Sequence, residues 1–157
     1  KWYDLFSYEN CNPRKPGVGD LLLATTDATI AAQNAVVAAE SLGIGSCYIG
    51  DILEQHDLHR KLLNLSEYVV PVCMLVLGYP ANDHFKRQKP QRCKLEDIVC
   101  VDHYYRKNEQ ELENMFEHKA GNKKLSEWTE AFCDRKYNSD FSKEMTRSVG
   151  EYLKQFE

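Results

Sequence analysis

The segment from Asp27 to Leu42, "DATIAAQNAVVAAESL", constrains the fold more than any other part of this 157-residue chain. Its apolar residues recur with the 3.6-residue period of an α-helix. They stand at positions 28, 31, 32, 35, 36, 38, 39 and 42. Thr26 or Asp27 can cap the start of this helix, and Gly43 can end it. The sequence therefore predicts a helix over residues 27–42.

This helix is expected to be surrounded by protein on most of its sides. Ile30 and Val37 fall on the flank opposite the main apolar stripe, and six alanines between residues 28 and 39 let other backbones approach closely. A helix that is apolar nearly all round is typical of the inside of a domain or of a subunit interface. We expect one of these two environments, and the second predicts a homodimer.

Strands and helices alternate on both sides of the glycine-rich segment that follows this helix. Residues 46–49 are expected to form a short strand, residues 51–63 a polar-faced helix, and residues 69–80 ("VVPVCMLVLGYP") a buried strand. The run 98–101 is a candidate edge strand or arm. Residues 1–20 contain turn residues and are interpreted as a connecting segment.

Beyond Tyr104 the composition changes to charged helices with thin apolar stripes. The stripes consist of Leu112, Met115 and Phe116, of Leu125, Trp128 and Phe132, and of Phe141, Met145, Val149, Tyr152, Leu153 and Phe156. Ser139 or Asp140 can cap the last helix. Thin stripes need another surface, so the tail is expected to pack on its own domain or on a partner subunit. We divide the chain into a domain over residues 1–103 and a helical extension over residues 104–157.

Charge and composition narrow the class of protein. A net charge of −4 gives no general attraction to nucleic acid or to anionic lipid. No run approaches the roughly 18 consecutive apolar residues of a membrane span, and no charged-then-apolar leader opens the chain. The six cysteines include no CxxC pair, which indicates reduced thiols. We expect a soluble cytoplasmic protein without a nucleic-acid or membrane partner.

Few side chains have the spacing of a catalytic or metal site. His56 and His59 could offer two imidazoles to one metal ion, but no third ligand is near in the sequence, and a solvated helix face is the favoured alternative. His84, His103 and His118 are isolated, and no nucleophile motif is present. We therefore predict neither a catalytic side chain nor a metal ligand.

A cluster of five cations, Lys86, Arg87, Lys89, Arg92 and Lys94, is a candidate anion site. It would bind an anion if the loop folds over a cleft. A solvated loop explains the same cluster, because runs of charge usually face water.

The stretch "LGIGSCYIGDI", residues 42–52, holds three of the eight glycines of the chain. Gly43 ends the preceding helix. Gly45 and Gly50 lie at the two ends of the strand, where the missing Cβ lets a flat ligand or another backbone come close. A tight helix–strand–helix corner without a ligand explains these glycines equally simply, and the residues alone favour that corner.

The order of these parts resembles the C-terminal half of the nitroreductase family of FMN-dependent oxidoreductases. The similarity is carried by "DATIAAQNAVVAAESLGIG", "SCYIGDI", "VPVCMLVLGYP" and "KRQKPQRCKLEDIV", and it covers roughly residues 20–101. The tail "RKYNSDFSKEM" is similar to the tails of bacterial members. The parts that form the N-terminal half of the family are absent, so we expect this chain to be the C-terminal portion of a longer protein.

The resemblance implies an α+β fold, with a central, mostly antiparallel sheet flanked by helices and a long helix in the core or dimer interface. It implies FMN as cofactor, bound at the interface of a homodimer. Tyr48, Ile49, Gly50 and Asp51 would lie against the isoalloxazine ring. Lys89 and Arg92 would bind the FMN phosphate, although "KPQR" is one residue longer than the "KPR" of the family, which leaves Arg87, Lys89 and Arg92 as candidates.

The implied activity transfers hydride from NAD(P)H through flavin N5 to a nitroaromatic, a quinone or a similar small-molecule acceptor in a ping-pong cycle. Because the cofactor supplies this chemistry, no catalytic side chain is needed. Two alternatives stay open. One is a flavin-fold dehydrogenase or dehalogenase with another substrate, and the other is a non-enzymatic module for flavin binding or assembly.

Overall fold

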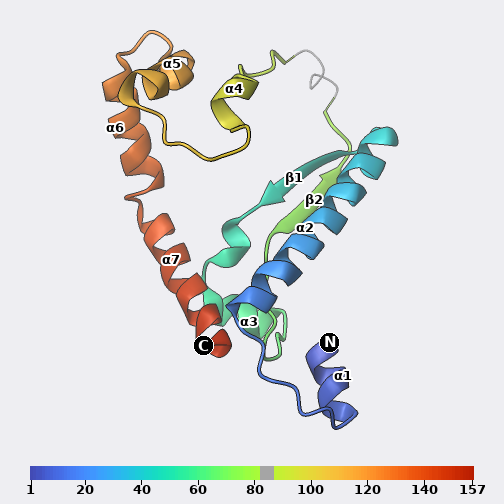
Figure 1. The fold of residues 1–157 in the computed structure, drawn as a ribbon. Helices are drawn as coiled ribbons and strands as arrows, with labels where there is room; N and C mark the ends of the chain where they lie inside the picture. The colour runs from blue at the N-terminus through green and yellow to red at the C-terminus, as the bar shows by residue number, and fades with distance from the viewer. Residues whose placement is uncertain (82–86) are drawn as a thin grey trace. The chain divides into compact units, whose positions relative to one another are not determined.

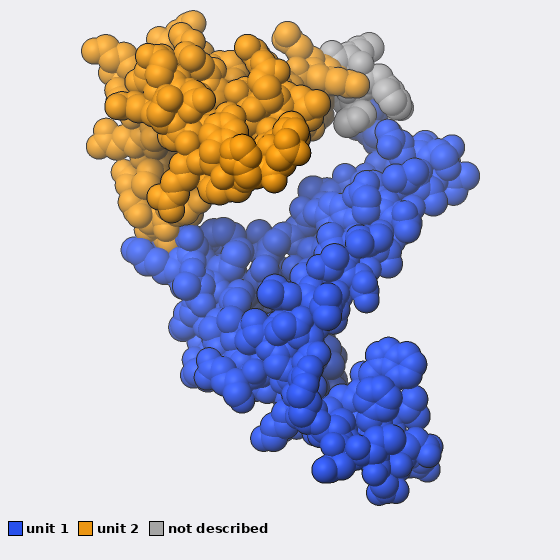
Figure 2. Space-filling view, viewed as in Figure 1, with its two compact units in different colours: residues 1–82, 140–157 blue, residues 83–139 orange. Residues whose placement is uncertain are grey.

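The computed structural model describes residues 1–81 and 87–157, which fall into two compact units (Figures 1 and 2). The first unit comprises residues 1–82 and 140–157, and the second comprises residues 83–139. The first contains α1 (Trp2–Tyr8), α2 (Val18–Ser41), β1 (Gly45–Ile49), η1 (Asp51–Leu53), α3 (His56–Leu62), β2 (Met74–Gly78), α7 (Asp140–Leu153) and η3 (Lys154–Phe156). The second contains α4 (Leu95–Ile98), α5 (Glu109–Ala120) and α6 (Leu125–Lys136). The expected division after residue 103 stays a prediction.

Helix α2 is longer at its N-terminus than the sequence predicted. It begins at Val18 instead of Asp27, because Asp20 accepts a hydrogen bond of 2.8 Å from the Gly17 N–H and caps the helix there. Thr26 lies inside the helix and donates its hydroxyl to the Leu22 carbonyl, as threonines within helices often do. The expectation that residues 1–20 only connect is also wrong, since α1 and the first turn of α2 lie there.

The C-terminus of α2 is where the sequence placed it. Gly43 has φ +74°, and the N–H groups of Gly43 and Ile44 donate to the carbonyls of Glu40 and Ala39. This pattern is a Schellman motif, in which a left-handed residue satisfies the last carbonyls of a helix. The prediction that Gly43 ends the helix is confirmed.

The two strands pair directly with each other. β1 runs antiparallel to β2, with a register from Gly45 opposite Gly78 to Ile49 opposite Met74. Helix α2 lies along β1 (Figure 1). The strand expected over residues 69–80 is therefore shorter than predicted, and it is not buried within this chain, because a two-stranded sheet with one helix leaves residues such as Val76 and Leu77 44% and 49% exposed.

Two segments have a different local structure from the one predicted. The single helix expected over residues 51–63 is interrupted: η1 ends at Leu53, Gln55 has φ +49°, and α3 begins at His56. The candidate edge strand 98–101 is wrong, because α4 occupies Leu95–Ile98 and Asp97 accepts a hydrogen bond from the Lys94 N–H at its start.

In the first unit, α7 packs against η1 and α3 and continues into η3. Ser148 and Tyr152 are fully buried there, and Phe156 is 6% exposed. Tyr152 packs edge-on against His56 with 4.4 Å between ring centroids. The final helix was predicted from its apolar stripe, and its packing places residues 140–157 on the same unit as α2 and β1.

The second unit is built from α5 and α6, which pack against each other. Both helices were expected from their stripes. A capping box fixes the start of α5, where the Asn108 side chain accepts from the Glu111 N–H at 3.0 Å and the Glu111 side chain accepts from the Asn108 N–H at 2.7 Å. Trp128 and Phe132 stack on α6 with 5.0 Å between their rings.

Helix α2 is the most exposed apolar element of the first unit. Leu23, Ile30 and Val37 are 71%, 57% and 58% exposed, and Ala39 is the one described residue of the helix that is buried. By length and mean hydropathy, α2 is also the one helix within the described residues that could cross a membrane. A core helix of a soluble protein passes the same test, so this observation is weak, and the expected lack of a membrane partner stays a prediction.

Candidate functional site

The glycine at the end of β1 is not required by the chain itself. Gly50 has φ −83° and ψ −17°, which any residue can adopt. A Cβ built on it would meet no atom within 4 Å. Neither backbone conformation nor close packing within the described chain therefore explains the glycine, which argues against the tight-corner alternative for Gly50.

Gly45, at the other end of the strand, has a different environment. A Cβ at this position would lie 3.5 Å from the Gly78 carbonyl oxygen on the neighbouring strand, which is ordinary van der Waals contact. At Gly45 the neighbouring strand is therefore the nearest structure. At Gly50, by contrast, the space around the Cα is unoccupied by described atoms.

Two main-chain N–H groups at the end of β1, those of Gly50 and Asp51, lack an acceptor among the described residues. The carbonyls of Gly50 and Asp51 accept from the N–H groups of Leu53 and Glu54 at 3.0 Å each. Across residues 1–81 and 87–157, no acceptor pairs with the N–H of Gly50 or of Asp51. The start of a helical turn leaves such donors unpaired. Both amides are therefore available to an acceptor that lies over Gly50.

Tyr48, two residues before Gly50, connects β1 to α2. The Tyr48 hydroxyl donates to the Gln33 side-chain oxygen at 3.4 Å, which links β1 to α2. Tyr48 is 38% exposed, Ile49 is half-buried, and Gly50 and Asp51 are exposed. The four residues expected to contact the flavin thus form one continuous, accessible edge of the first unit.

The cations expected at a phosphate belong to the second unit. Lys89 and Arg92 are exposed there, as is Arg87, whereas Lys86 and His84 lie outside the described residues. Lys94 has a local role, because its ammonium lies 3.9 Å from the Glu96 carboxylate and its N–H bonds the Asp97 side chain at the start of α4. Lys94 is therefore a weaker candidate for binding an anion than Lys89 or Arg92.

His56 and His59 each have a local polar contact. The Nδ1 of His56 lies 3.0 Å from an Asp57 carboxylate oxygen, and the Nδ1 of His59 lies 2.6 Å from the Glu54 carbonyl oxygen. No group of three His, Cys, Asp or Glu side chains among the described residues could hold a metal ion. Both histidines instead make local polar contacts around α3.

Sequence reasoning missed a polar network that joins α7 to the segment just after β1. Glu144 accepts from the Gln55 N–H at 3.1 Å, and the buried Ser148 hydroxyl oxygen accepts from the His56 N–H at 2.9 Å. Ser148 in turn donates to Glu144 at 2.8 Å, and Arg147 pairs with the same carboxylate at 2.7 Å. The "EMTRS" spacing indicates a pair between Glu144 and Arg147 within one helix, but nothing in it identifies the partner some 90 residues away.

The electrostatics of this network favour an ionised Glu144. Hydrogen bonds from the Arg147 guanidinium, and then from the Ser148 hydroxyl, hold the pKa of the Glu144 carboxyl at about 2. A carboxylate accepts hydrogen bonds from main-chain N–H groups more strongly than a neutral acid does. Glu144 therefore stays an acceptor for the Gln55 amide across the physiological pH range.

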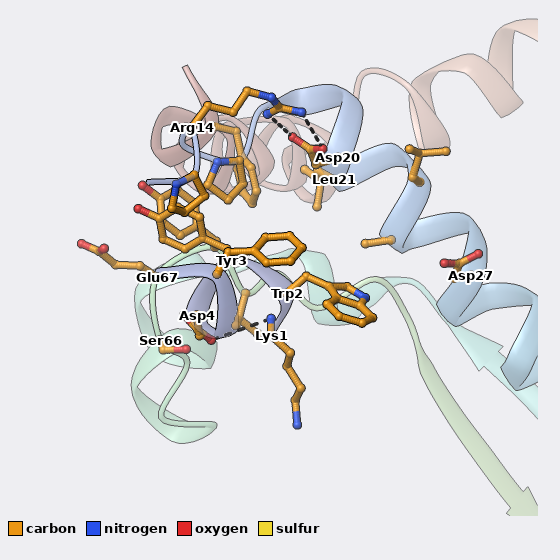
Figure 3. A pocket seen from close by; sticks show the side chains of 18 residues that line it. Lys1, Trp2, Tyr3, Asp4, Arg14, Asp20, Leu21, Asp27, Ser66 and Glu67 are labelled. Atoms are coloured by element: carbon orange, nitrogen blue, oxygen red, sulfur yellow. Dashed lines mark hydrogen bonds and ion pairs between the residues drawn. The ribbon is translucent and has the colours of Figure 1, made fainter. Parts of the chain in front are cut away.

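A separate cavity of about 670 Å³ lies between α1, the start of α2 and residues 66–69 (Figure 3). Its walls combine aromatic and apolar side chains with several charged ones, among them Asp27 and Glu67. Arg14 makes two hydrogen bonds to Asp20, of 2.6 and 3.0 Å. None of the predicted site residues lines this cavity. We therefore place the candidate site at the end of β1.

Comparisons with known proteins agree with the resemblance seen in the sequence. The model of the nitroreductase family matches residues 8–79, a range that contains α2, β1 and β2 but not Lys89 or Arg92. The "CR(VI) reductase" of Pseudomonas sp. (strain G-1) is 31% identical over 123 residues, which are 73% of this chain and 49% of that protein. The "FMN reductase (NADPH)" of Bacillus subtilis (strain 168) is 43% identical over 61 residues, which are 39% of this chain and 24% of that protein.

A solved structure from Bacteroides fragilis NCTC 9343 has the same fold. It is 21% identical to this chain with a TM-score of 0.81, and the match covers 98% of this chain and 65% of that one. This likeness confirms the α+β class, and together with the family model it confirms the nitroreductase-like fold. The chain spans at most about half the length of the two curated relatives.

Proposed function

The chain belongs to the nitroreductase family through residues 8–79, and on this premise we propose that it is part of an FMN-dependent NAD(P)H oxidoreductase. The observation that carries the proposal is the end of β1. Two N–H groups that have no acceptor among the described residues stand beside a glycine that neither its backbone angles nor its described neighbours require. This edge fits a flat heteroaromatic ring, because the ring can approach the backbone closely and accept hydrogen bonds from it.

In the proposed complex, the chain's own residues bind and orient the cofactor. The main chain of Tyr48, Ile49, Gly50 and Asp51 would lie against the ring, with the Gly50 or Asp51 N–H directed at N5. Lys89 and Arg92 would bind the phosphate through charge-assisted hydrogen bonds. When bound, FMN supplies the hydride transfer from NAD(P)H to an acceptor. The protein contributes oriented donors, which act as preorganised electrostatic stabilisation.

The names of the relatives support reductase chemistry without fixing the acceptor. One relative is named for FMN and NADPH and the other for Cr(VI), and the family for nitro compounds. We propose a nitroaromatic, a quinone or a similar small oxidant as the acceptor, and a cytoplasmic location. A dehydrogenase or dehalogenase on the same fold differs in its acceptor and is distinguished by acceptor profiling.

We also propose that the protein is a homodimer and that α2 lies in its interface. The support is the row of exposed apolar residues along α2, which a second copy would cover.

The experiment that tests the function is spectroscopic. The purified full-length protein should be yellow, or should take up added FMN, and its flavin absorbance should bleach when NADPH or NADH is added without oxygen. A colourless protein that takes up no FMN would disprove the proposal. Flavin that binds but is not bleached by either nicotinamide would favour the non-enzymatic alternative.

A further inference from the structure

The C-terminal helices hold two residues whose backbone is in the left-handed region. Gln55 has φ +49° and Tyr68 has φ +58°, which are uncommon angles for residues other than glycine. The Gln55 N–H donates to Glu144 on α7 at 3.1 Å, and the Tyr68 N–H donates to Gln155 on η3 at 2.7 Å. Strained residues of this kind persist where the surrounding structure fixes them. Here the same C-terminal segment fixes both.

The contacts around each of these residues reinforce the hydrogen bond. Next to Gln55, the His56 N–H donates to Ser148, which is fully buried. Next to Tyr68, Phe156 packs edge-on against the Tyr68 ring with 5.6 Å between centroids. A buried hydroxyl that both donates and accepts is costly to remove, since its partners are left unpaired. The C-terminal segment therefore determines the path of residues 55–68 through specific polar contacts as well as apolar packing.

This path begins immediately after the candidate site. Only η1, Asp51–Leu53, and Glu54 separate Gly50 from Gln55. The turn is short, and the Leu53 and Glu54 N–H groups donate back to the Gly50 and Asp51 carbonyls. Gln55 is thus separated from the Gly50 and Asp51 amides by a single hydrogen-bonded turn.

We propose that α7 and η3 form a clamp that positions the Gly50 and Asp51 amides for the flavin ring, with Glu144 and Ser148 as positioning residues. The inference rests on the proposed function and assigns a role to the C-terminal segment. Neither residue touches the cofactor in this arrangement. Each acts through the main chain of Gln55 and His56.

The test compares Ser148→Ala, Glu144→Ala and Glu144→Gln in the full-length protein. Lys143→Ala is the control, because Lys143 is an exposed residue of α7 whose partner, Asp140, is also exposed. The first readout is hydrogen exchange of peptides that cover residues 50–58. The second is the FMN dissociation constant of the apoprotein, measured by flavin fluorescence. Both readouts are independent of turnover.

Ser148→Ala and Glu144→Ala should speed exchange in residues 50–58 and weaken FMN binding by about fivefold to tenfold, the effect expected for one lost hydrogen bond to a buried or charged group. Glu144→Gln should lie between the wild type and Glu144→Ala, since its amide oxygen still accepts from the Gln55 N–H but no longer carries the charge that pairs with Arg147. Lys143→Ala should change neither readout. If Ser148→Ala does not fold, the Glu144 pair gives the same comparison, because Glu144 is partly exposed.

Faster exchange with unchanged FMN affinity would overturn the proposal, and so would unchanged exchange. A Glu144→Gln variant as weak as Glu144→Ala would also overturn it, because the retained acceptor would then be irrelevant. A wild-type protein that binds no FMN disproves the function proposed above and the flavin role of the clamp together. In that case the exchange data still decide whether the clamp fixes residues 50–58.

Discussion

Gly50 has ordinary backbone angles, and no described atom lies within 4 Å of the position that a Cβ would take. A larger side chain should therefore leave the fold intact but block the binding of a flat ring. Gly50→Val should leave the free energy of unfolding within about 0.5 kcal/mol of the wild type, as for most exposed substitutions. It should weaken FMN binding by more than about tenfold, because Cβ and two methyl groups would occupy the ring's position.

Thermal unfolding and a flavin fluorescence titration measure the two effects of Gly50→Val. Gly19→Ala, at an exposed position of α2 where a Cβ also meets no atom within 4 Å, is the matched control. If Gly50→Val binds FMN as tightly as Gly19→Ala does, Gly50 is not the floor of a flavin site.

The exposed cations of the second unit give a second prediction at the residue scale. Lys89→Ala and Arg92→Ala should each weaken FMN binding by about 1.5 to 3 kcal/mol if each loses a charged hydrogen bond to the phosphate. Lys94→Ala is the control, since its ammonium is near Glu96. An affinity unchanged in the Lys89→Ala, Arg92→Ala double variant would move the phosphate site elsewhere, with Arg87→Ala as the next variant to titrate.

Some single residues could be predicted from the sequence and others could not. Gly43 was predicted correctly as a helix stop, because its φ of +74° follows from local chemistry that glycine satisfies. The left-handed Gln55 was not predicted, because Glu144 and Ser148, which hold it, lie far away in the sequence. The roles of the residues from Tyr48 to Asp51 depend on a ligand, so the sequence could suggest them only through family resemblance.

At the scale of elements, the start of α2 illustrates why helix boundaries are harder to predict than helices. The periodic residues from 28 onward identified the helix, but its first turn is fixed by Asp20. Asp20 combines a cap to Gly17 with an ion pair to Arg14, which comes from outside the helix. An ion pair of this kind produces no periodic pattern in the sequence. Thr26 and Asp27 are residues that often cap helices, so they led to a predicted start nine residues too late.

The same carboxylate predicts how the stability of this element depends on pH. Hydrogen bonds from Arg14, and then from the Gly17 N–H, lower the pKa of Asp20 from 3.8 to about 2. Because the folded pKa is depressed, the stabilisation is complete above the unfolded pKa and is lost as pH falls through the folded one. The free energy of unfolding should therefore fall more steeply in the wild type than in Asp20→Asn between pH 4 and pH 2.

Urea denaturation at several pH values measures this difference in pH dependence. Asp140→Asn removes an exposed carboxylate from the start of α7 and is the control. Parallel pH profiles for the wild type and Asp20→Asn would show that the ion pair with Arg14 does not contribute to stability in solution.

At the scale of the whole molecule, the apolar residues of α2 need a covering surface, which either another part of a longer protein or a second copy would supply. Leu23, Ile30 and Val37 are spaced by seven residues, so they lie on one face of the helix, and each is more than half exposed. Apolar residues at this spacing form the seams of packed helices. The sequence analysis could place Ile30 and Val37 on this flank, but it could not decide between a domain core and an interface, because both require the same residues.

If the face formed by Leu23, Ile30 and Val37 pairs two copies, one charge in its centre should separate them. Ile30→Glu would place an unpaired carboxylate in an apolar interface of about 2,000 Å² or more, and the cost of such a group is several kcal/mol. The variant should therefore sediment as a monomer at micromolar concentrations where the wild type is a dimer. Since the flavin is proposed to lie at the subunit interface, the monomer should also lose most of its bound FMN.

Leu58→Glu is the control for Ile30→Glu, because Leu58 is a 52% exposed apolar residue on α3 outside the proposed interface. It should stay dimeric and keep its flavin. Sedimentation velocity with detection at both protein and flavin wavelengths follows assembly and cofactor in one experiment. A dimer that survives Ile30→Glu would place the interface on another element, whereas a monomer that keeps its FMN would show that one subunit suffices to hold the cofactor.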